Sequence, residues 1–203
     1  MVLALLQVFD ATIISDSKNE IKISAKGIEI EKVKSEIENG QLVVRIKKKW
    51  NDWSSKRTDV TAIITYAQEL DEVSSSSGAS VHSENSIVSD NLELDASSGA
   101  SLDVSLQCRE VSVDVSSGAR VETSGSTTDL IVDMSSGSTY KGYDLSSKNA
   151  SIEGSSGASA QIHVSNSLEA DVSSGASVKY KGNPSNKDVD KSSGGSVRSS
   201  GGR

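Results

Sequence analysis

Aromatic residues, cysteine and proline are scarce in this chain of 203 residues. Phenylalanine, tryptophan and tyrosine together make up 3% of the sequence, so a folded core must be built from valine, isoleucine, leucine and alanine. The single cysteine, Cys108, excludes an intramolecular disulfide and a zinc site made of several cysteines, and we expect it to be a small apolar filler. The single proline, Pro184, argues against a proline-rich disordered segment.

Positive charge and long apolar runs are also in short supply. The sequence has 21 lysine and arginine residues against 28 aspartate and glutamate residues, a formal net charge of -7 at pH 7. Phosphate binding needs a basic face, so nucleic acid is not expected as a partner. The apolar start MVLALLQVF is too short to span a bilayer and has no basic region before it. It predicts a first strand, with no transmembrane segment and with any export leader absent from this chain.

The motif Ser-Ser-Gly recurs along the chain and is its clearest pattern. Successive glycines of the motif are separated by 21, 19, 19, 20, 18 and 19 residues. These glycines are Gly78, Gly99, Gly118, Gly137, Gly157, Gly175 and Gly194. A fixed period of about 19 residues is the sequence sign of a solenoid, and the period is too short for a helical hairpin.

Positions around each glycine keep their character from copy to copy, which a disordered linker has no reason to do. The fifth residue before it is apolar in all seven copies, from Val73 to Val189, and the third residue after it is uncharged, from Val81 to Val197. The fourth residue before it is acidic in six copies, namely Asp95, Asp114, Asp133, Glu153, Asp171 and Asp190. In stacked coils the apolar columns would fill the interior, and glycine would allow a positive φ at each corner.

These patterns predict an all-β protein in two parts. Residues 69–203 are expected to form a single-stranded solenoid of about seven coils. In residues 1–68, the period-two alternation of NEIKISAK, GQLVVRIKKKW and DVTAIITYAQ predicts ordinary antiparallel strands, and the segment 28–40 fits a short helix or another strand. We expect this N-terminal β-strand region to cap one end of the solenoid, because the strand edges at a solenoid's end must be covered. The other end could fray or pair with a second chain.

The repeated SSGAS, flanked by LELD, VSVDV and LIVDM, resembles the bacterial head GIN domain family, also called the auto-transporter adhesin domain. The segments KSEIENGQLVVRI and YKGNPSNKDVDKSSGGSVR are similar to the N-terminal part and the closing segment of that family, so the resemblance covers nearly the whole chain. It implies a right-handed parallel β-helix with a β-rich N-terminal part. It also implies export to the cell envelope or the extracellular side of a bacterium, and it implies no reaction.

The acidic column has two interpretations. Carboxylates stacked about 5 Å apart repel by roughly 3 kcal/mol at an effective dielectric constant of 20, so something must offset the repulsion. Each carboxylate could accept the backbone N–H of the serine two residues on, in a turn that faces water. The alternative is a Ca²⁺ site, although the Gly-Gly-x-Gly-x-Asp repeat of calcium solenoids is missing. We favour the turn, so the acidic residues and the glycines are predicted to be structural, and no metal or other cofactor is expected.

The segment KKKWNDWSSKR, from Lys47 to Arg57, is the least repetitive part of the chain. It joins two predicted strands and holds five basic residues together with Trp50 and Trp53. Tryptophan stacks well on sugar rings and on cations, so Lys49, Trp50, Trp53 and Arg57 are the preferred binding residues. The alternative is a charged loop whose tryptophans pack on the end of the rod.

These features favour a non-catalytic protein of the cell envelope or the extracellular surface, acting as an adhesin, scaffold or binding module. Its expected partner is a cell-surface glycan or protein, and self-association through the solenoid ends or a flat face is a further option. The alternative is a lyase or hydrolase acting on polysaccharide, because glycoside hydrolysis needs two carboxylates about 5 to 9 Å apart. Active sites usually gather unlike residues, whereas these acids are equivalent, so no catalytic residue is predicted. A concave cleft holding at least two carboxylates of raised pKa would favour the enzyme.

Overall fold

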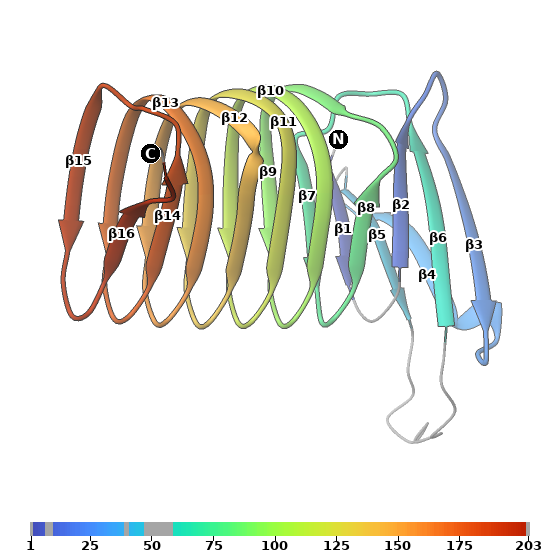
Figure 1. Ribbon diagram of the computed structural model, residues 1–203. Coiled ribbons are helices and arrows are strands. Elements are labelled where there is room, and N and C mark those ends of the chain that lie inside the picture. The colour runs from blue at the N-terminus through green and yellow to red at the C-terminus, as the bar shows by residue number, and fades with distance from the viewer. Residues whose placement is uncertain (1, 7–9, 39–40, 47–58, 202–203) are drawn as a thin grey trace.

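The computed structural model describes residues 2–6, 10–38, 41–46 and 59–201. Within these ranges sixteen strands join into one sheet, which winds about a common axis as a parallel β-solenoid (Figure 1). The prediction of an all-β solenoid of about seven coils is confirmed. In this described part the only helical element is the 3-10 turn η1 (Ile30–Lys32), and no helix is long and apolar enough to cross a membrane.

The strands recur about every 19 residues in the second part of the chain, and they are spaced less regularly before it. In chain order they are β1 (Val2–Leu6), β2 (Asp10–Ser15), β3 (Glu20–Lys26), β4 (Val33–Glu38), β5 (Gln41–Ile46), β6 (Asp59–Tyr66), β7 (Glu72–Ser76), β8 (Ser80–Ser83), β9 (Ile87–Ala96), β10 (Ser101–Val115), β11 (Arg120–Met134), β12 (Thr139–Gly154), β13 (Ser159–Val172), β14 (Ser177–Lys181), β15 (Asn186–Lys191) and β16 (Ser196–Ser199). Each of β10 to β13 covers most of one coil.

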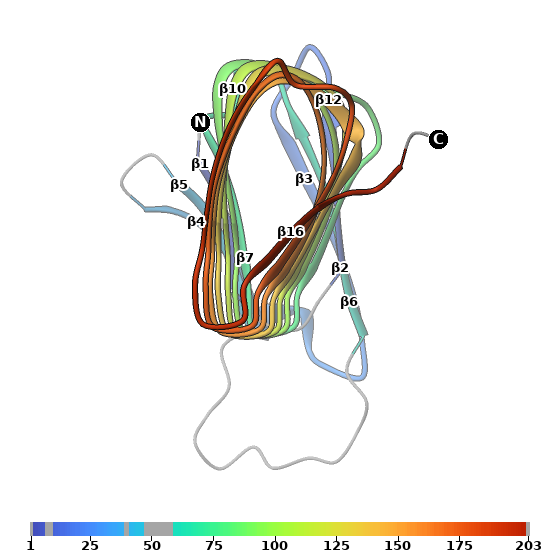
Figure 2. The ribbon, with the colours of Figure 1, turned by 60° about the vertical axis from the view of Figure 1, so that its left-hand side comes forward.

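Each repeat coil has two broad faces, joined by a tight turn at one edge and a wide bend at the other, which gives the oval outline in Figure 2. In β10, residues 101–106 belong to what we call the ascending face, residues 107–109 form the bend, and residues 110–115 belong to the descending face. The ascending face continues through β6, β2, β8, β14 and β16. The descending face continues through β5, β1, β7, most of β9, and β15.

The tight turns are the Ser-Ser-Gly motifs, and all seven share one backbone conformation. In the turn at residues 97–100, Ser98 has a φ of 52° and Gly99 a φ of 73°, and the N–H of Ala100 donates to the carbonyl of Ser97 over 3.0 Å. Two successive positive φ angles closed by this hydrogen bond fit a type I′ turn. The second serine of every motif adopts a positive φ as well as the glycine, which the sequence did not indicate.

The acidic residue before each turn does not close it. The N–H of Ser97, which was expected to donate to the carboxylate of Asp95, donates instead to the carbonyl of Ser75 in the preceding coil over 3.1 Å. The same bond joins Ser116 to the carbonyl of Ala96 over 3.0 Å. The Asx-turn interpretation is therefore wrong, because the N–H that it needs is already used to hold one coil on the next.

The core is a set of aliphatic columns that run along the rod. The predicted column five residues before the glycine is buried at Val73, Leu94, Val113 and Val132, each at most 1% exposed. Neighbouring members pair in register, as Val113 does with Val132. Fully burying a side chain of this kind contributes roughly 1.5 to 3 kcal/mol, so each added coil extends one continuous core.

The N-terminal part departs from its expected antiparallel arrangement. The pairs β1–β5, β1–β7, β2–β6 and β2–β8 are all parallel, so these strands add coils to the solenoid instead of forming a separate antiparallel sheet. Only β3 with β6 and β4 with β5 pair antiparallel. Segment 28–40, left open between helix and strand, forms η1 and β4 in its described residues. In the sheet order β1 lies between β5 and β7, and β3 and β4 lie at the outer end of the stack (Figure 1).

Candidate functional site

The acidic residues of the repeat form a column on the descending face, beside the tight turns. Asp95 pairs with Asp114, Asp114 with Asp133, and the column continues strand by strand through Glu153, Asp171 and Asp190. Partial burial, followed by the charge of Asp114, raises the pKa of both Asp95 and Asp133. The column is therefore a line of like charges, in which Asp95 and Asp133 hold their protons more tightly than free carboxyls do.

Two further columns add acidic residues to the descending face, among serine, asparagine and isoleucine. From β7 to β15, the outward positions of this face carry Glu72, Glu93, Asp95, Glu110, Asp114, Asp129, Asp133, Glu153, Glu169, Asp171, Asp188 and Asp190. In these described strands no lysine or arginine takes an outward position on this face. Basic side chains lie instead on the ascending face, at Arg120, Lys141, Lys179 and Arg198. The two faces thus differ in charge.

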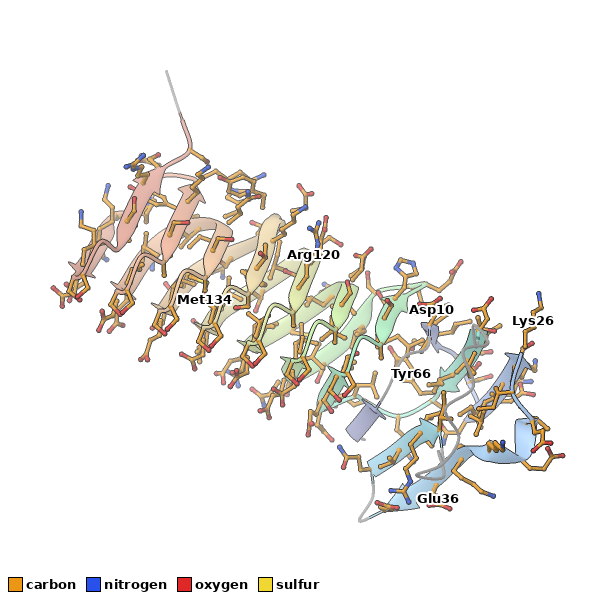
Figure 3. The ribbon with its side chains drawn as sticks, turned by 90° about the horizontal axis from the view of Figure 1, so that it is seen from below. Asp10, Lys26, Glu36, Tyr66, Arg120 and Met134 are labelled. Atoms are coloured by element: carbon orange, nitrogen blue, oxygen red, sulfur yellow. The ribbon has the colours of Figure 1, made fainter. Side chains whose placement is uncertain are left out.

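A hollow of about 270 Å³ opens beside the acidic column, and we call it the ladder hollow. It is lined by Asp114, Asp133, Glu153 and Asp171 among others, and it lies where Gly154 replaces the larger residues that precede it in its column. Figure 3 views this side of the rod and labels Met134, whose Sδ-methyl end fills the space that a side chain at position 154 would take.

The ladder hollow does not meet the criterion set for an enzyme. Raised pKa values belong to Asp133, which lines it, and to Asp95, which does not. Asp95 and Asp133 are therefore not gathered in this hollow. Across the described residues, no three side chains of histidine, cysteine, aspartate or glutamate are grouped so that they could hold a metal ion.

The predicted binding loop cannot be placed. Lys49, Trp50, Trp53 and Arg57 lie outside the described residues, so their role in binding stays a prediction.

A second hollow, of about 610 Å³, lies at the wide bend, where the N-terminal coils meet the first repeat coil; we call it the bend hollow. Its lining comes from five places in the chain: the end of β2, the end of β6 and the link that follows it, the start of β9, and the bend of β10. The lining residues are Ser15, Tyr66, Ala67, Gln68, Glu69, Val88, Ser89, Asp90, Gln107, Cys108 and Arg109. The bend hollow is thus the place where unlike side chains interrupt the repeat.

The floor of the bend hollow is buried and its rim is exposed. Tyr66, Ser89 and Cys108 are at most 8% exposed. Burial raises the pKa of Cys108 to about 11, and burial also raises the pKa of Tyr66. The Oη of Tyr66 is buried, and the Ser15 hydroxyl beside it lowers the pKa of Tyr66 by hydrogen bonding, whereas the Cys108 thiol raises it. Tyr66 is labelled in Figure 3.

Hydrogen bonds fix the walls of the bend hollow. A carboxylate oxygen of Glu69 accepts the N–H of Asp90 over 2.5 Å, which ties the link after β6 to β9. The guanidinium of Arg109 donates to the side-chain oxygen of Asn91 and to the carboxylate of Glu110. These bonds hold three of the rim segments in place without a ligand, as preorganised sites require.

A third hollow, of about 420 Å³, lies near the outer N-terminal strands and is more apolar. Ile21, Ile37, Leu42 and Ile64 line it together with polar residues of the β3 and β6 ends. Ile37, on β4, is 77% exposed. This end of the rod therefore presents aliphatic surface as well as strand edges.

Sequence reasoning found the columns but missed the bend hollow. Cys108 was interpreted as a small apolar filler, and it is buried as expected, yet its neighbours are polar. Tyr66 appeared only as part of a predicted strand. The one available signal was the spacing of 21 residues between Gly78 and Gly99, the longest in the series, which marks extra residues near the bend.

Comparison with known proteins agrees with the fold. Residues 3–184 match the family model described as "Putative auto-transporter adhesin, head GIN domain". No curated protein matches the chain.

Among solved structures, a putative adhesin from Bacteroides fragilis has a TM-score of 0.87 and 19% identity, with 97% of this chain and 90% of that chain covered. A putative lipid binding protein from Parabacteroides distasonis has a TM-score of 0.71 and 13% identity, covering 98% and 92%. A putative adhesin from Parabacteroides merdae has a TM-score of 0.70 and 18% identity, covering 98% and 91%. At these identities the likeness shows a shared fold.

Proposed function

Because the chain belongs to the family of the head GIN domain, described as a putative auto-transporter adhesin, we propose that it is a non-catalytic binding module of the bacterial cell envelope that engages a glycan at the cell surface. Its exposed faces would serve as contact surfaces, and the rod would hold them at a distance from its point of attachment.

One observation carries the proposal: the titratable groups of the solenoid are repeated equivalents on a broad face, not an acid and a base brought together. Asp114, Asp133 and Glu153 occupy the same position in successive coils. Catalytic pairs need environments that push their pKa values apart, so that one group is protonated and the other ionised. A repeated column suits binding better than catalysis, because it offers the same contact to each unit of an extended partner.

A glycan array probed with the whole chain tests the proposal. We expect binding to a restricted set of surface glycans, weakened in the variants Trp50→Ala and Trp53→Ala if the predicted loop takes part. If both variants bind glycans as the wild type does, the loop is not the binding site, and the proposal of glycan binding still stands. Absence of binding to every glycan on the array would contradict glycan engagement.

The second candidate is a polysaccharide-acting enzyme, and the ladder hollow is what favours it. There Asp133, whose pKa is raised by burial, stands next to Asp114 and Glu153, so several carboxyl groups line one hollow. Incubation with acidic and neutral polysaccharides, followed by measurement of new reducing ends, separates the two candidates. Release that is lost in Asp133→Asn would favour the enzyme over the binding module.

The surface location can be tested separately. Intact cells that express the full natural gene are treated with protease, and the chain is followed by immunoblotting. We expect degradation without cell lysis. Protection in intact cells, with degradation only after the envelope is opened, would place the chain inside the envelope and contradict display at the surface.

A further inference from the structure

We propose that the later half of the ascending face binds a polysaccharide of uronic acid units, laid along the rod so that its carboxylates meet a row of basic side chains. We call this surface the basic strip: Lys141, Gln161, Lys179 and Arg198 form its column, and Lys181 lies beside them. The inference rests on the proposed function, to which it adds a site and a class of ligand.

The basic strip is a single column of outward side chains in register. Lys141 of β12 pairs with Gln161 of β13. Lys179 of β14 pairs with Gln161 on one side and with Arg198 of β16 on the other. Paired strands lie about 4.8 Å apart, so the four positions extend over roughly 14 Å. An extended polysaccharide advances by a similar distance for each sugar unit, so the strip offers one contact position to each unit.

Positive charge is in excess at the strip, and part of it is unpaired. From β12 to β16 the charged residues of the ascending face are one acid and four bases, namely Asp144, Lys141, Lys179, Lys181 and Arg198. Lys141 approaches Glu122 of β11 at 3.8 Å, but the same carboxylate oxygen lies 2.8 Å from Arg120. Lys179 and Arg198 are exposed, and neither makes an ion pair with a residue that the structure describes. These two cations are therefore available to an anionic partner.

An aromatic ring lies at the edge of the strip. The pairing of β12 with β13 shifts after Gly142, and Tyr143 lies in this irregularity, where its side chain is partly exposed. Its ring centroid lies 5.6 Å from Nζ of Lys181, which is also 4.0 Å from the carboxylate of Asp144. Bulges in strands often turn a side chain toward a functional site. A ring beside cations offers an apolar contact to a sugar whose carboxylate the cations hold.

A column of hydroxyls runs alongside the basic column. Two positions before each member of the strip, on the same face of the sheet, stand Thr139, Ser159, Ser177 and Ser196. A hydroxyl both donates and accepts hydrogen bonds, so this column matches the hydroxyls of a sugar chain. A partner that carries carboxylates and hydroxyls on every unit uses both columns at once.

The spacing of charge favours a polysaccharide over other anionic polymers. Double-stranded DNA carries one charge per about 1.7 Å, whereas the strip offers at most one base per coil. A uronate chain carries one carboxylate per sugar unit and so matches the coils. A second copy of the chain would bring a net charge of -7 toward another of the same sign, which opposes self-association.

The test is a calorimetric titration of the whole chain with tetragalacturonate and tetramannuronate, and with cellotetraose as the neutral counterpart. We expect at least one uronate tetramer to bind, more weakly as salt is added, and to bind at least tenfold more tightly than cellotetraose. Lys179→Gln combined with Arg198→Gln should weaken that binding about tenfold, because two exposed charge contacts are lost. Lys22→Gln combined with Lys26→Gln is the matched control, since it removes the same charge from β3 at the other end of the rod, and it should bind as the wild type does.

Several results would overturn the inference. They are failure of both uronate tetramers to bind, equal binding of cellotetraose, unchanged affinity in the Lys179 and Arg198 double variant, or tighter binding of a tetraglutamate peptide or a DNA oligomer. Light scattering that gives the mass of two chains for the wild type and of one for that double variant would assign the strip to a second copy instead.

Failure here can be told from failure of the proposed function. If the glycan array shows binding that survives the Lys179 and Arg198 double variant, the function stands and this site is wrong. If no glycan binds in either experiment, both are wrong.

Discussion

The hydroxyls of Thr123 and Tyr140 lie 2.8 Å apart inside the solenoid, where both side chains are at most 1% exposed. Tyr140 takes a position that is valine, leucine or alanine in the other coils, and the column can hold it for two reasons. Its hydroxyl has a partner in the neighbouring coil, and Gly142 leaves room, since a side chain at that position would lie 2.6 Å from the Tyr140 hydroxyl. Burial raises the pKa of Tyr140, so it stays neutral.

Removing the Tyr140 hydroxyl should therefore be costly. Tyr140→Phe leaves the Thr123 hydroxyl buried and without this partner, and we expect a loss of about 1 to 2 kcal/mol in the free energy of unfolding by urea. The double variant Thr123→Val with Tyr140→Phe should recover part of the loss, because neither polar group then remains. Losses that simply add would show that the bond does not couple the two coils.

The turn conformation makes a second prediction. Gly118 has a φ of 72°, and a side chain there would meet nothing within 4 Å, so Gly118→Ala tests backbone strain alone. We expect it to cost about 1 kcal/mol in urea unfolding. Ser117→Ala is the control, because Ser117 already carries a side chain at a φ of 52° and should change stability by less than about 0.5 kcal/mol. Equal stability of both variants would contradict the left-handed turn.

The acidic column predicts a dependence of stability on pH. The pKa values of Asp95 and Asp133 are raised in the folded chain from 3.8, so between 3.8 and the raised values the folded state binds more protons than the unfolded state. Their ionisation therefore lowers stability as the pH rises through the raised values. The double variant Asp95→Asn with Asp133→Asn should be more stable than the wild type at pH 7, by about 0.5 kcal/mol for each like-charge contact relieved.

That advantage should shrink as the pH falls toward about 4, where the wild-type carboxyls take up protons. Urea unfolding of both chains at the two pH values measures it, and Asp103→Asn on the ascending face serves as the control for loss of one surface charge. An advantage that is the same at both pH values would show that the column does not act through its charge.

The strand β15 carries charges that oppose further strand pairing. Lys187 pairs with Leu168, and Lys191 pairs with Val172, so lysines occupy columns that are otherwise apolar and inward-facing. Inward charges on an edge strand are a known obstacle to further strand pairing. Lys187→Leu combined with Lys191→Val should therefore promote end-to-end association, seen as a higher mass in light scattering. Lys148→Leu, an exposed lysine at a bend, is the control, and equal masses for all three chains would contradict the idea.

Much of the fold was predictable because the residues that stack in a solenoid recur at a fixed period in the sequence. Val113 and Val132 could be placed in one column from spacing alone, and their strands pair in that register. The order of the N-terminal strands was not predictable, because alternation of apolar and polar residues does not distinguish parallel from antiparallel neighbours. The chain reaches β1 first but places it between β5 and β7, and no local pattern records that arrangement.

The bend hollow was hidden for a related reason. Tyr66 and Cys108 are 42 positions apart and belong to no shared column, so their contact exists only once the N-terminal coils are stacked on the repeat. For the acidic column, the sequence predicted the register correctly. It did not predict that the Ser97 N–H donates to a backbone carbonyl of the preceding coil. A repeat pattern identifies equivalent positions, and it does not identify a site made of unlike residues.

The central claim is that the chain binds a glycan and leaves it intact. The most direct measurement is mass spectrometry of a defined oligosaccharide after binding to the whole chain, prolonged incubation and release. We predict that the oligosaccharide is retained by the wild type and is recovered at its original mass. Recovery of shortened or unsaturated products, or no retention by the wild type, would contradict the account.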